Sequence, residues 1–221
     1  MRYFPVYLDI QNRPCLVIGG GGVGTRKART LLRAGARVTV VSPEATPQLE
    51  ALAAEGRIRL HRRPYTDLDM EGVFLVFGTT DNRELNRRIS EDAQRLGVWC
   101  NIADQPDRGQ FVLPAVVSRG DLLISIATSG KSPALARRIR REIETAYGPE
   151  YARLLDLLGA LRQRLLSQGH DPQGHKKLFE ALLDSDLLES IRAGDTERIE
   201  CCLKEHCGDT IVWEDLMTPA P

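Results

Sequence analysis

A glycine-rich run near the start of the chain has the composition of a loop that binds phosphate. It follows the apolar residues 15–18 and precedes residues 25–32, which have the pattern of a helix. Gly19 would allow a tight turn off a strand, Gly21 would leave room for a pyrophosphate beside the backbone, and Gly24 would let the helix pack close to the sheet. The amides that begin the helix would then face the anion. We expect the dinucleotide contacts of this loop to come from Gly19, Gly21, Gly22, Val23 and Gly24.

An acidic residue follows this loop at the distance that dinucleotide recognition requires. A second apolar run, 37–42, ends at Pro43 and Glu44, and Glu44 lies 20 residues past Gly24. A carboxylate there can accept hydrogen bonds from the ribose hydroxyls of adenosine, and it repels a 2′-phosphate. The pattern therefore predicts a site for NAD rather than NADP, with Pro43 and Glu44 in it. The alternative is a glycine-rich strand–helix turn in another kind of α/β protein.

Small polar residues and a carboxylate follow two later strands. In a doubly wound sheet, ligands meet the carboxyl ends of the strands. Thr79 and Thr80 follow the apolar run 73–78, and we expect them between the adenine and nicotinamide positions. The next strand contains Asn101, which we also expect at the cofactor, and Asp104 follows at the nicotinamide end of the cleft. Asp104 is a candidate proton acceptor in an oxidation. The alternative is an aspartate that only shapes a turn.

Basic residues are concentrated in residues 136–141 and on the loop before them. Arginine pairs well with carboxylates, so Arg137 and its neighbours are candidates for binding a polycarboxylate. The alternative is a solvated helix face balanced by Glu142 and Glu144. Lys131 is the better candidate for an anion because it lies near the N-terminus of the predicted helix.

Composition and charge restrict the class of protein. The chain has 221 residues, of which 42% are hydrophobic and 27% charged, with 30 basic and 30 acidic residues. The zero net charge predicts no general attraction to nucleic acid or to a membrane. No apolar run is long enough to span a bilayer, and the first residues lack the apolar core of a secretion signal. We therefore expect a cytoplasmic protein.

Cysteine and histidine give little sign of a metal centre. The five cysteines are an odd number in a chain without an export signal, which argues against a disulfide framework. Residues 201–207 contain three of them and His206, but the spacing matches no common zinc module. We predict no metal site, and leave this segment open between a ligand cluster and an ordinary helix end. The other histidines are His61, His170 and His175.

Strand and helix patterns alternate through the first half of the chain. This order predicts a Rossmann-like, doubly wound parallel sheet of the α/β class. The predicted strands are 15–18, 37–42, 58–61, 73–78 and 98–102, and the predicted helices are 25–32, 46–55 and 82–96.

The pattern changes in the second half. Too few residues separate the predicted strands 111–118 and 122–128 for a crossover, so they form an antiparallel hairpin. A helix over 134–147 follows, with Ser132 as its cap and Pro133 in its first turn. The remainder is almost all helical in pattern. It has a loop at 171–174, helices at 177–188 and 196–203, and leucines at helical spacing at 154, 155, 158, 161 and 165.

Taken together, these segments resemble the precorrin-2 dehydrogenases, including the N-terminal module of siroheme synthases. The resemblance covers about residues 1–165, in the family's order and spacing, and beyond that only helical character matches. The matching segments are YFPVYLD (3–9), the glycine loop with RKA (26–28), TTD (79–81), CNIAD (100–104), FVLPA (111–115) and TSGKSPALA (128–136).

The resemblance implies an architecture, a reaction and site residues. A dinucleotide-binding domain over 1–113 would precede a hairpin-plus-helix segment over 114–148 that builds a homodimer, and a small all-α domain over 149–221. The reaction would be the NAD-dependent oxidation of precorrin-2 to sirohydrochlorin in siroheme biosynthesis. Asp104 matches the aspartate that the family uses, and accepts a proton. The substrate carries eight carboxylates, which favours Ser129, Lys131 and Arg137 as substrate-binding residues.

Two questions stay open at this level. Some relatives also act as ferrochelatases, inserting ferrous iron into sirohydrochlorin in the same cleft, and nothing in this sequence decides whether this chain does. The rival function is an NAD-sensing regulatory module without catalysis, which also uses a glycine loop followed by an acid.

Overall fold

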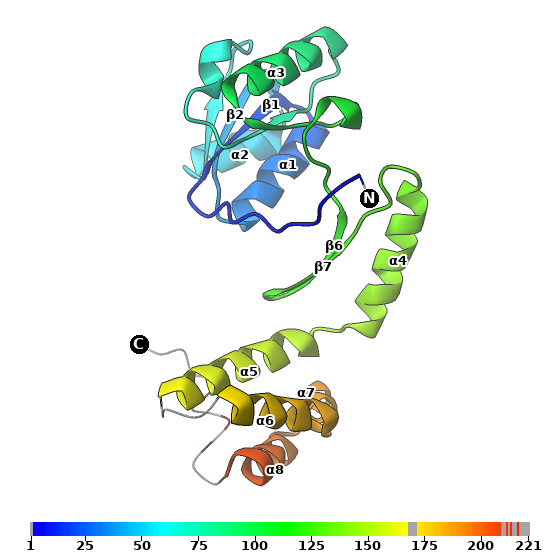
Figure 1. Ribbon diagram of the computed structural model, residues 1–221. Helices are drawn as coiled ribbons and strands as arrows, with labels where there is room; N and C mark the ends of the chain where they lie inside the picture. Colours follow the sequence, from blue (N-terminus) through cyan, green and yellow to red (C-terminus); the bar gives the residue numbers. More distant parts are fainter. Residues whose placement is uncertain (1, 168–171, 209–210, 212, 214–215, 217–221) are drawn as a thin grey trace. The chain divides into compact units, whose positions relative to one another are not determined.

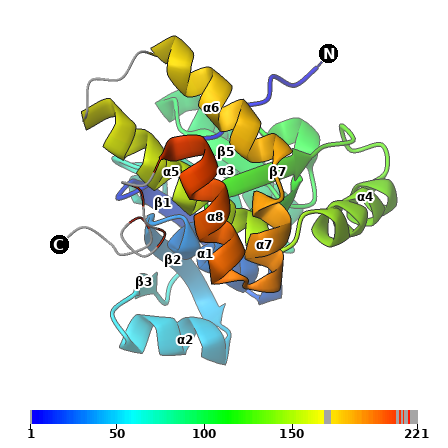
Figure 2. The ribbon, with the colours of Figure 1, turned by 90° about the horizontal axis from the view of Figure 1, so that it is seen from below.

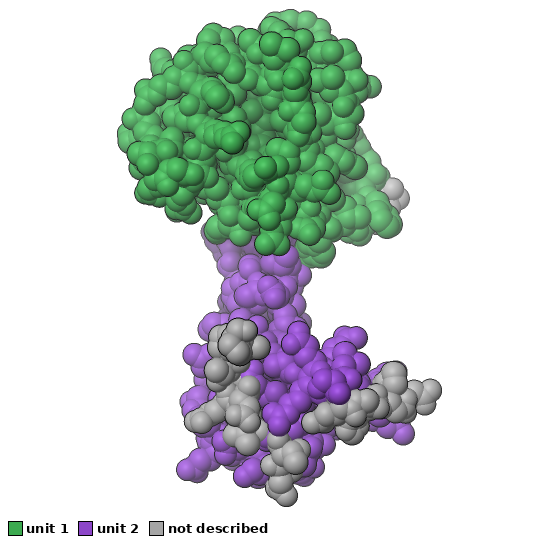
Figure 3. Space-filling model, turned by 90° about the vertical axis from the view of Figure 1, so that its left-hand side faces the viewer, with its two compact units in different colours: residues 1–113 green, residues 114–221 purple. Residues whose placement is uncertain are grey.

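The computed structural model describes residues 2–167, 172–208, 211, 213 and 216. The chain divides into two compact units, residues 1–113 and 114–221 (Figure 3). The predicted further boundary at residue 148 stays a prediction. No helix in the described part of the chain is long and apolar enough to cross a membrane.

A five-stranded parallel sheet forms the centre of the first unit, so the predicted doubly wound fold is confirmed. The strand order is β3-β2-β1-β4-β5. The chain therefore winds outward in one direction from β1 to β3 and in the other from β4 to β5. Ligands bind such sheets where the winding reverses, at the carboxyl ends of β1 and β4. The strands are β1 (Pro14–Gly20), β2 (Arg37–Ala45), β3 (Ile58–His61), β4 (Leu75–Gly78) and β5 (Trp99–Ile102).

Helices cover both faces of this sheet. On one face, α1 (Gly22–Arg33) and α2 (Pro47–Ala54) bury apolar residues such as Leu31 and Leu49 against the strands. On the other face, α3 (Arg83–Leu96) packs with Ile89 and Ala93. Figure 1 shows α1 and α3 on opposite sides of the sheet, and Figure 2 shows α2 beside the edge strand β3. The strand interiors are buried on both faces, as the continuous apolar runs predict.

Local signals set the ends of these helices. The side chains of Thr46 and Asn82 accept hydrogen bonds from the amides of Leu49 and Leu85, and so cap α2 and α3. Gly97 ends α3 in the left-handed conformation, with φ +68°. Short 3-10 turns, η1 (Asp67–Met70) and η2 (Pro106–Arg108), connect the later elements.

The strand expected to begin at Phe111 is wrong, because β6 (Ala115–Arg119) begins four residues later. The backbone at Phe111 is held by the first unit instead. The Asn101 side-chain amide donates to the Phe111 carbonyl oxygen at 3.0 Å, and the Phe111 ring packs edge-on to Phe77 with 5.7 Å between centroids. Residues 111–113 therefore cannot join the hairpin ladder.

The second unit begins with the predicted antiparallel hairpin. β6 pairs with β7 (Leu122–Ile126) from Ala115–Ile126 to Arg119–Leu122. Gly120 opens the two-residue turn with φ +58°, the conformation that tight hairpins require at this position. α4 (Pro133–Ala146) follows with Ser132 as its cap, as predicted.

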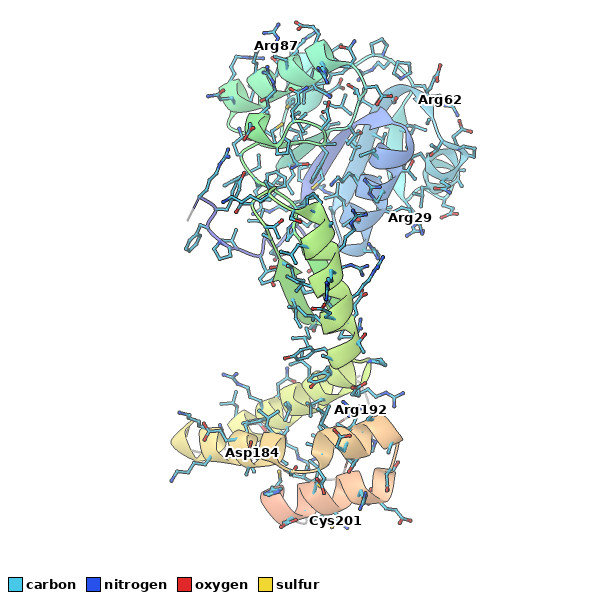
Figure 4. The ribbon with its side chains drawn as sticks, turned by 90° about the vertical axis from the view of Figure 1, so that its right-hand side faces the viewer. Arg29, Arg62, Arg87, Asp184, Arg192 and Cys201 are labelled. Carbon is cyan, nitrogen blue, oxygen red and sulfur yellow. The ribbon has the colours of Figure 1, made fainter. Side chains whose placement is uncertain are left out.

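Four further helices lie in the described part of the second unit, namely α5 (Glu150–Ser167), α6 (Pro172–Asp184), α7 (Leu187–Ala193) and α8 (Thr196–Cys207). Their core differs from the predicted leucine pattern, since Leu157 is fully buried whereas Leu155 is exposed. α7 and α8 lie side by side in Figures 1 and 2. Arg192, labelled in Figure 4, joins α7 to the start of α5 by donating to Glu150 at 2.8 and 3.0 Å.

Two predicted boundaries in this helical part are also wrong. Residues 172–174 belong to α6 rather than to a loop, because Pro172 suits the first turn of a helix, while residue 171 lies outside the described residues. The helix expected over 177–188 is interrupted at Ser185, whose hydroxyl donates to the Leu182 carbonyl and accepts from the Leu187 amide. That side chain competes with the helical ladder and separates α6 from α7.

Candidate functional site

The glycines between β1 and α1 have different structural constraints. Gly19 has φ +112°, which L side chains rarely adopt, and a Cβ there would lie 2.8–2.9 Å from atoms of Thr79. A Cβ on Gly24 would lie 2.0 Å from the Gly19 carbonyl oxygen, so the close packing of helix on strand requires glycine. Gly20 is equally restricted, since its Cβ would lie 2.1 Å from the Glu44 carbonyl oxygen. The motif spacing assigned no role to Gly20.

Gly21 and Gly22, by contrast, face open space. A Cβ on either would have no heavy atom within 4 Å. Gly21 is the N-cap of α1 and supplies no capping side chain, and the first turn of α1 contains no acidic residue. The first intrahelical bond runs from the Thr25 amide to the Gly21 carbonyl at 2.9 Å, so the preceding amides have no carbonyl partner in the helix.

This arrangement fits the diphosphate of a dinucleotide. Free amides and the positive end of the helix dipole meet at a surface without side chains. Gly21, Gly22 and the exposed Val23 are the residues of the loop that such an anion would contact.

Pro43 and Glu44 lie beside the glycine loop within β2, which extends to Ala45 rather than ending at residue 42 as predicted. The extension arises because β1 contains an irregularity between Ile18 and Gly20, after which Gly20 pairs with Ala45. Pro43 and Glu44 are exposed. The loop and β2 are tied by the Thr46 amide, which donates to the Gly20 carbonyl at 3.0 Å. The carboxylate of Glu44 therefore belongs to the same edge of the sheet as the loop.

The end of β4 contributes Thr79 and Thr80. Thr79 is buried, and its hydroxyl donates to the carbonyls of Ile18 and Gly19 at 2.9 and 3.2 Å. It fixes the turn after β1, so its effect on a cofactor acts through Gly19. Thr80 donates its hydroxyl to the Asn86 side-chain oxygen at 2.8 Å.

Asn86 is a buried polar residue that the motif analysis missed. It lies on α3 with no exposed surface, and its side-chain amide donates both to the Thr80 carbonyl at 2.8 Å and to Asp104 Oδ1 at 3.1 Å. Asn86 therefore joins the end of β4 to the carboxylate that follows β5. A polar residue on the face of α3 that carries Ile89 and Ala93 could have marked this position.

Asp104 is exposed to solvent, and it accepts that hydrogen bond from Asn86. It lies after β5, one strand along from β4, and lines a hollow of about 520 Å³. The buried Asn86 fixes one carboxylate oxygen and leaves the group accessible, which is the arrangement that a proton acceptor needs.

Asn101 lies in β5, where it is buried opposite Phe77 of β4. Its side-chain amide already donates to the Phe111 carbonyl. The structure therefore gives Asn101 a part in holding residues 109–113, and a contact to a cofactor stays a prediction.

Lys27 was also missed by the sequence analysis. The side chain is half-buried on α1, with its ammonium 5.7 Å from the centroid of the Phe77 ring. Burial, with a smaller contribution from the charge of Arg26, lowers the pKa of Lys27 to about 8. Among the described residues, no carboxylate lies within ion-pair distance of it.

The predicted substrate residues Ser129, Lys131 and Arg137 belong to the second unit. Ser129 and Lys131 are exposed on the loop before α4, and Ser129 has φ +52°, uncommon for a residue with a side chain. Arg137 is exposed on α4, where Arg138 and Arg140 pair with glutamates four residues later. The structure thus neutralises part of the basic helix and leaves Arg137 available.

The cysteine-rich segment is the C-terminal part of α8. Cys201 is exposed and labelled in Figure 4, whereas Cys202 and Cys207 are half-buried and pack against the helical core. Within the described ranges, no three His, Cys, Asp or Glu side chains come close enough to hold a metal ion. His170 lies outside those ranges.

Comparison with known proteins gives consistent matches to both units. Residues 6–115 match a family described as "Putative NAD(P)-binding", and residues 119–146 match the family "Sirohaem biosynthesis protein central". A siroheme synthase of Ectopseudomonas mendocina is 40% identical over 206 residues, covering 93% of this chain and 44% of the relative. Siroheme synthase 1 of Aeromonas salmonicida is 36% identical, covering 88% of this chain and 42% of the relative.

The chain therefore spans less than half the length of these curated relatives. The solved structure of SirC, a precorrin-2 dehydrogenase, matches over its whole length. It superposes with a TM-score of 0.72 at 26% identity, covering 90% of this chain and 100% of that one.

Proposed function

The chain belongs to the family of precorrin-2 dehydrogenases and siroheme synthase N-terminal modules, and from this we propose that it oxidises precorrin-2 to sirohydrochlorin with a nicotinamide dinucleotide. One observation of the site carries the proposal. A glycine loop with open space at the start of α1 and a carboxylate held by a buried amide lie at the carboxyl edge of one parallel sheet.

The residues at this edge of the sheet would have different roles in an oxidation. The α1 amides bind the diphosphate, with Gly21 and Gly22 leaving the approach open. The bound dinucleotide supplies the hydride acceptor. Asp104 accepts the proton that the ring system loses, while Asn86 keeps the carboxylate in one orientation. In the second unit, Ser129, Lys131 and Arg137 remain our candidates for contacts to the substrate carboxylates.

We propose NAD rather than NADP as the cofactor, on the position of Glu44. The residue is exposed beside the glycine loop, and a carboxylate there favours free ribose hydroxyls over a 2′-phosphate. The test is to compare kcat/KM for the two cofactors in the parent and in Glu44→Ser. We expect a preference for NAD that narrows in the variant. An unchanged ratio would exclude Glu44 from this discrimination.

A homodimer built through residues 114–148 is also part of the proposal. The face of the hairpin that carries Val116 and Leu123 is exposed at 43% and 44%, and Leu135 on α4 is exposed at 49%. A two-stranded hairpin is marginally stable alone, which favours covering this face with a second copy. Light scattering after gel filtration measures the mass. Val116→Glu should shift a dimer toward monomer, whereas a monomeric parent would exclude the arrangement.

The experiment that tests the reaction mixes the protein, NAD and precorrin-2 without oxygen and follows the visible spectrum. Formation of sirohydrochlorin with an equivalent of reduced cofactor supports the proposal. A protein that binds NAD but leaves the tetrapyrrole unchanged is a sensing module instead. Adding ferrous iron to preformed sirohydrochlorin in a separate reaction decides whether iron insertion also occurs.

A further inference from the structure

The hollow beside Asp104 has an arginine-rich lining that the reaction as described does not use. It lies in the first unit, between the start of α3 and the turn η2 that follows β5, and its volume is about 520 Å³. Its lining residues are Arg83, Glu84, Arg87, Asp104, Gln105 and Arg108.

The three arginines of this lining are not equivalent. Arg87, labelled on α3 in Figure 4, is neutralised by Glu84 one turn before it and by Glu91 one turn after it. Arg83 and Arg108 are exposed, and neither forms an ion pair with any residue that the structure describes. The hollow therefore presents the guanidinium groups of Arg83 and Arg108 outside ion-pair distance of any described carboxylate. Its two carboxylates are Asp104 and Glu84, whose pKa is lowered chiefly by Arg87 and in smaller part by the charge of Arg108.

The position of Arg83 is unfavourable for the fold itself. It occupies the first position of α3, directly after the cap Asn82, where the helix dipole favours an acidic residue. Arg108 ends η2, and its backbone carbonyl accepts from the Ser90 hydroxyl, which fixes η2 against α3. The backbone is thus anchored at both arginines while their side chains stay available to a ligand.

We propose that Arg83 and Arg108 form a carboxylate-binding subsite that holds acidic side chains of the substrate beside Asp104. This inference rests on the proposed function, because it assigns the subsite to the same tetrapyrrole. The planar guanidinium fork matches a carboxylate in two parallel hydrogen bonds. If the arginines anchor one edge of the ring, the reacting carbon stays within reach of Asp104. The arginines are needed for this because the Asp104 carboxylate repels a polyanionic substrate.

The cofactor is the other anion that could reach this sheet edge. Its diphosphate site lies at α1, which packs on the opposite face of the sheet from α3. The subsite is therefore assigned to the substrate, and the experiment separates the two anions.

The test uses the double variant Arg83→Gln/Arg108→Gln in the full chain. We expect KM for precorrin-2 to rise by about 10-fold or more, as for two lost charge-assisted contacts, with kcat within about 3-fold of the parent and KM for NAD unchanged. The matched control is Arg29→Gln/Arg59→Gln, which removes the same charge from exposed arginines of the first unit outside the hollow. It should leave all three constants near the parent values.

A second variant separates the effect of the forked guanidinium geometry from the effect of the positive charge. Arg83→Lys/Arg108→Lys keeps both charges and should give an intermediate KM for precorrin-2. It also keeps the inference testable if the glutamine variant unfolds, which circular dichroism would reveal.

Each alternative outcome has one meaning. An unchanged KM for precorrin-2 in an active double variant overturns the subsite and leaves the reaction standing. A rise in KM for NAD would assign the arginines to the cofactor and overturn the inference. An equal rise of KM for precorrin-2 in the control variant would show that only net charge matters, and would also overturn the inference. A parent protein that does not oxidise precorrin-2 refutes the proposed function itself.

Discussion

Replacing Gly21 with aspartate should raise the stability of the protein and strongly weaken its binding of the cofactor. Gly21 is the N-cap of α1, has extended backbone angles that aspartate adopts readily, and faces open space. An aspartate there can accept from the free amides of the first turn. It improves on glycine as a cap by a few tenths of a kcal/mol, and its interaction with the helix dipole adds about 0.3–1 kcal/mol. The free energy of unfolding should therefore rise by about 0.5–1 kcal/mol.

The same carboxylate would occupy the place that we propose for the diphosphate, and it carries the same sign of charge. One like-charge pair at hydrogen-bonding range costs about 1 kcal/mol in water and about 4 kcal/mol near a protein surface. With two phosphate charges the penalty is about 2–8 kcal/mol, so affinity for NAD should fall by about 30-fold or more. Gly21→Asn is the control, because it caps the helix with a side chain of the same size but no charge. Its loss of affinity measures the steric part alone.

Urea unfolding followed by circular dichroism gives the stability change, and calorimetric titration gives the affinity for NAD. Two results would refute the reasoning. Unchanged affinity in the aspartate variant would mean that α1 does not bind the diphosphate. A loss of stability in both variants would mean that Gly21 is constrained by packing, against the open space around it.

Three further predictions follow from the same unit. Asp104→Asn should keep NAD affinity and lose about 10²–10⁴-fold in kcat, the range for a proton acceptor, and full turnover would remove Asp104 from the mechanism. Gly24→Ala should lower the free energy of unfolding by about 1–3 kcal/mol or more, because the new Cβ overlaps the Gly19 carbonyl. Gly22→Ala should change the free energy of unfolding by less than about 1 kcal/mol, and urea titrations of the two variants make the comparison. Lys27→Met should stabilise the protein on the order of 2 kcal/mol at pH 7, because burial lowers the pKa of Lys27 from 10.5 to about 8 and the folded state disfavours its charge. Since the unfolded chain binds the extra proton between about pH 8 and 10.5, the gain should shrink as the pH rises through that window, and a gain independent of pH would exclude this cause.

Local sequence patterns predicted the elements that depend on short-range physics. The buried strands are continuous apolar runs in the sequence. Ser132 was predicted to cap its helix because a short polar side chain can reach the amide three residues on, and Thr46 and Asn82 cap their helices in the same way. The parallel order of the sheet followed from alternating strands and helices, since a parallel pair needs a crossover. One error appeared where a distant partner decides a backbone conformation, whereas those at Pro172 and Ser185 have local causes. Phe111 leaves the hairpin because Asn101 and Phe77 hold it.

The candidate site shows the same division. The spacing of the glycines and the acid at residue 44 predicted a dinucleotide loop from the sequence, because that chemistry depends on residues close together along the chain. Which glycine is constrained, and by which carbonyl, was decided by the packing of Gly20 against Glu44 and of Gly24 against Gly19. The bond from Asn86 to Asp104 likewise needed the folded structure. The two residues lie 18 positions apart, a spacing that neither the helix nor the strand repeat connects. They meet only because α3 packs against β5.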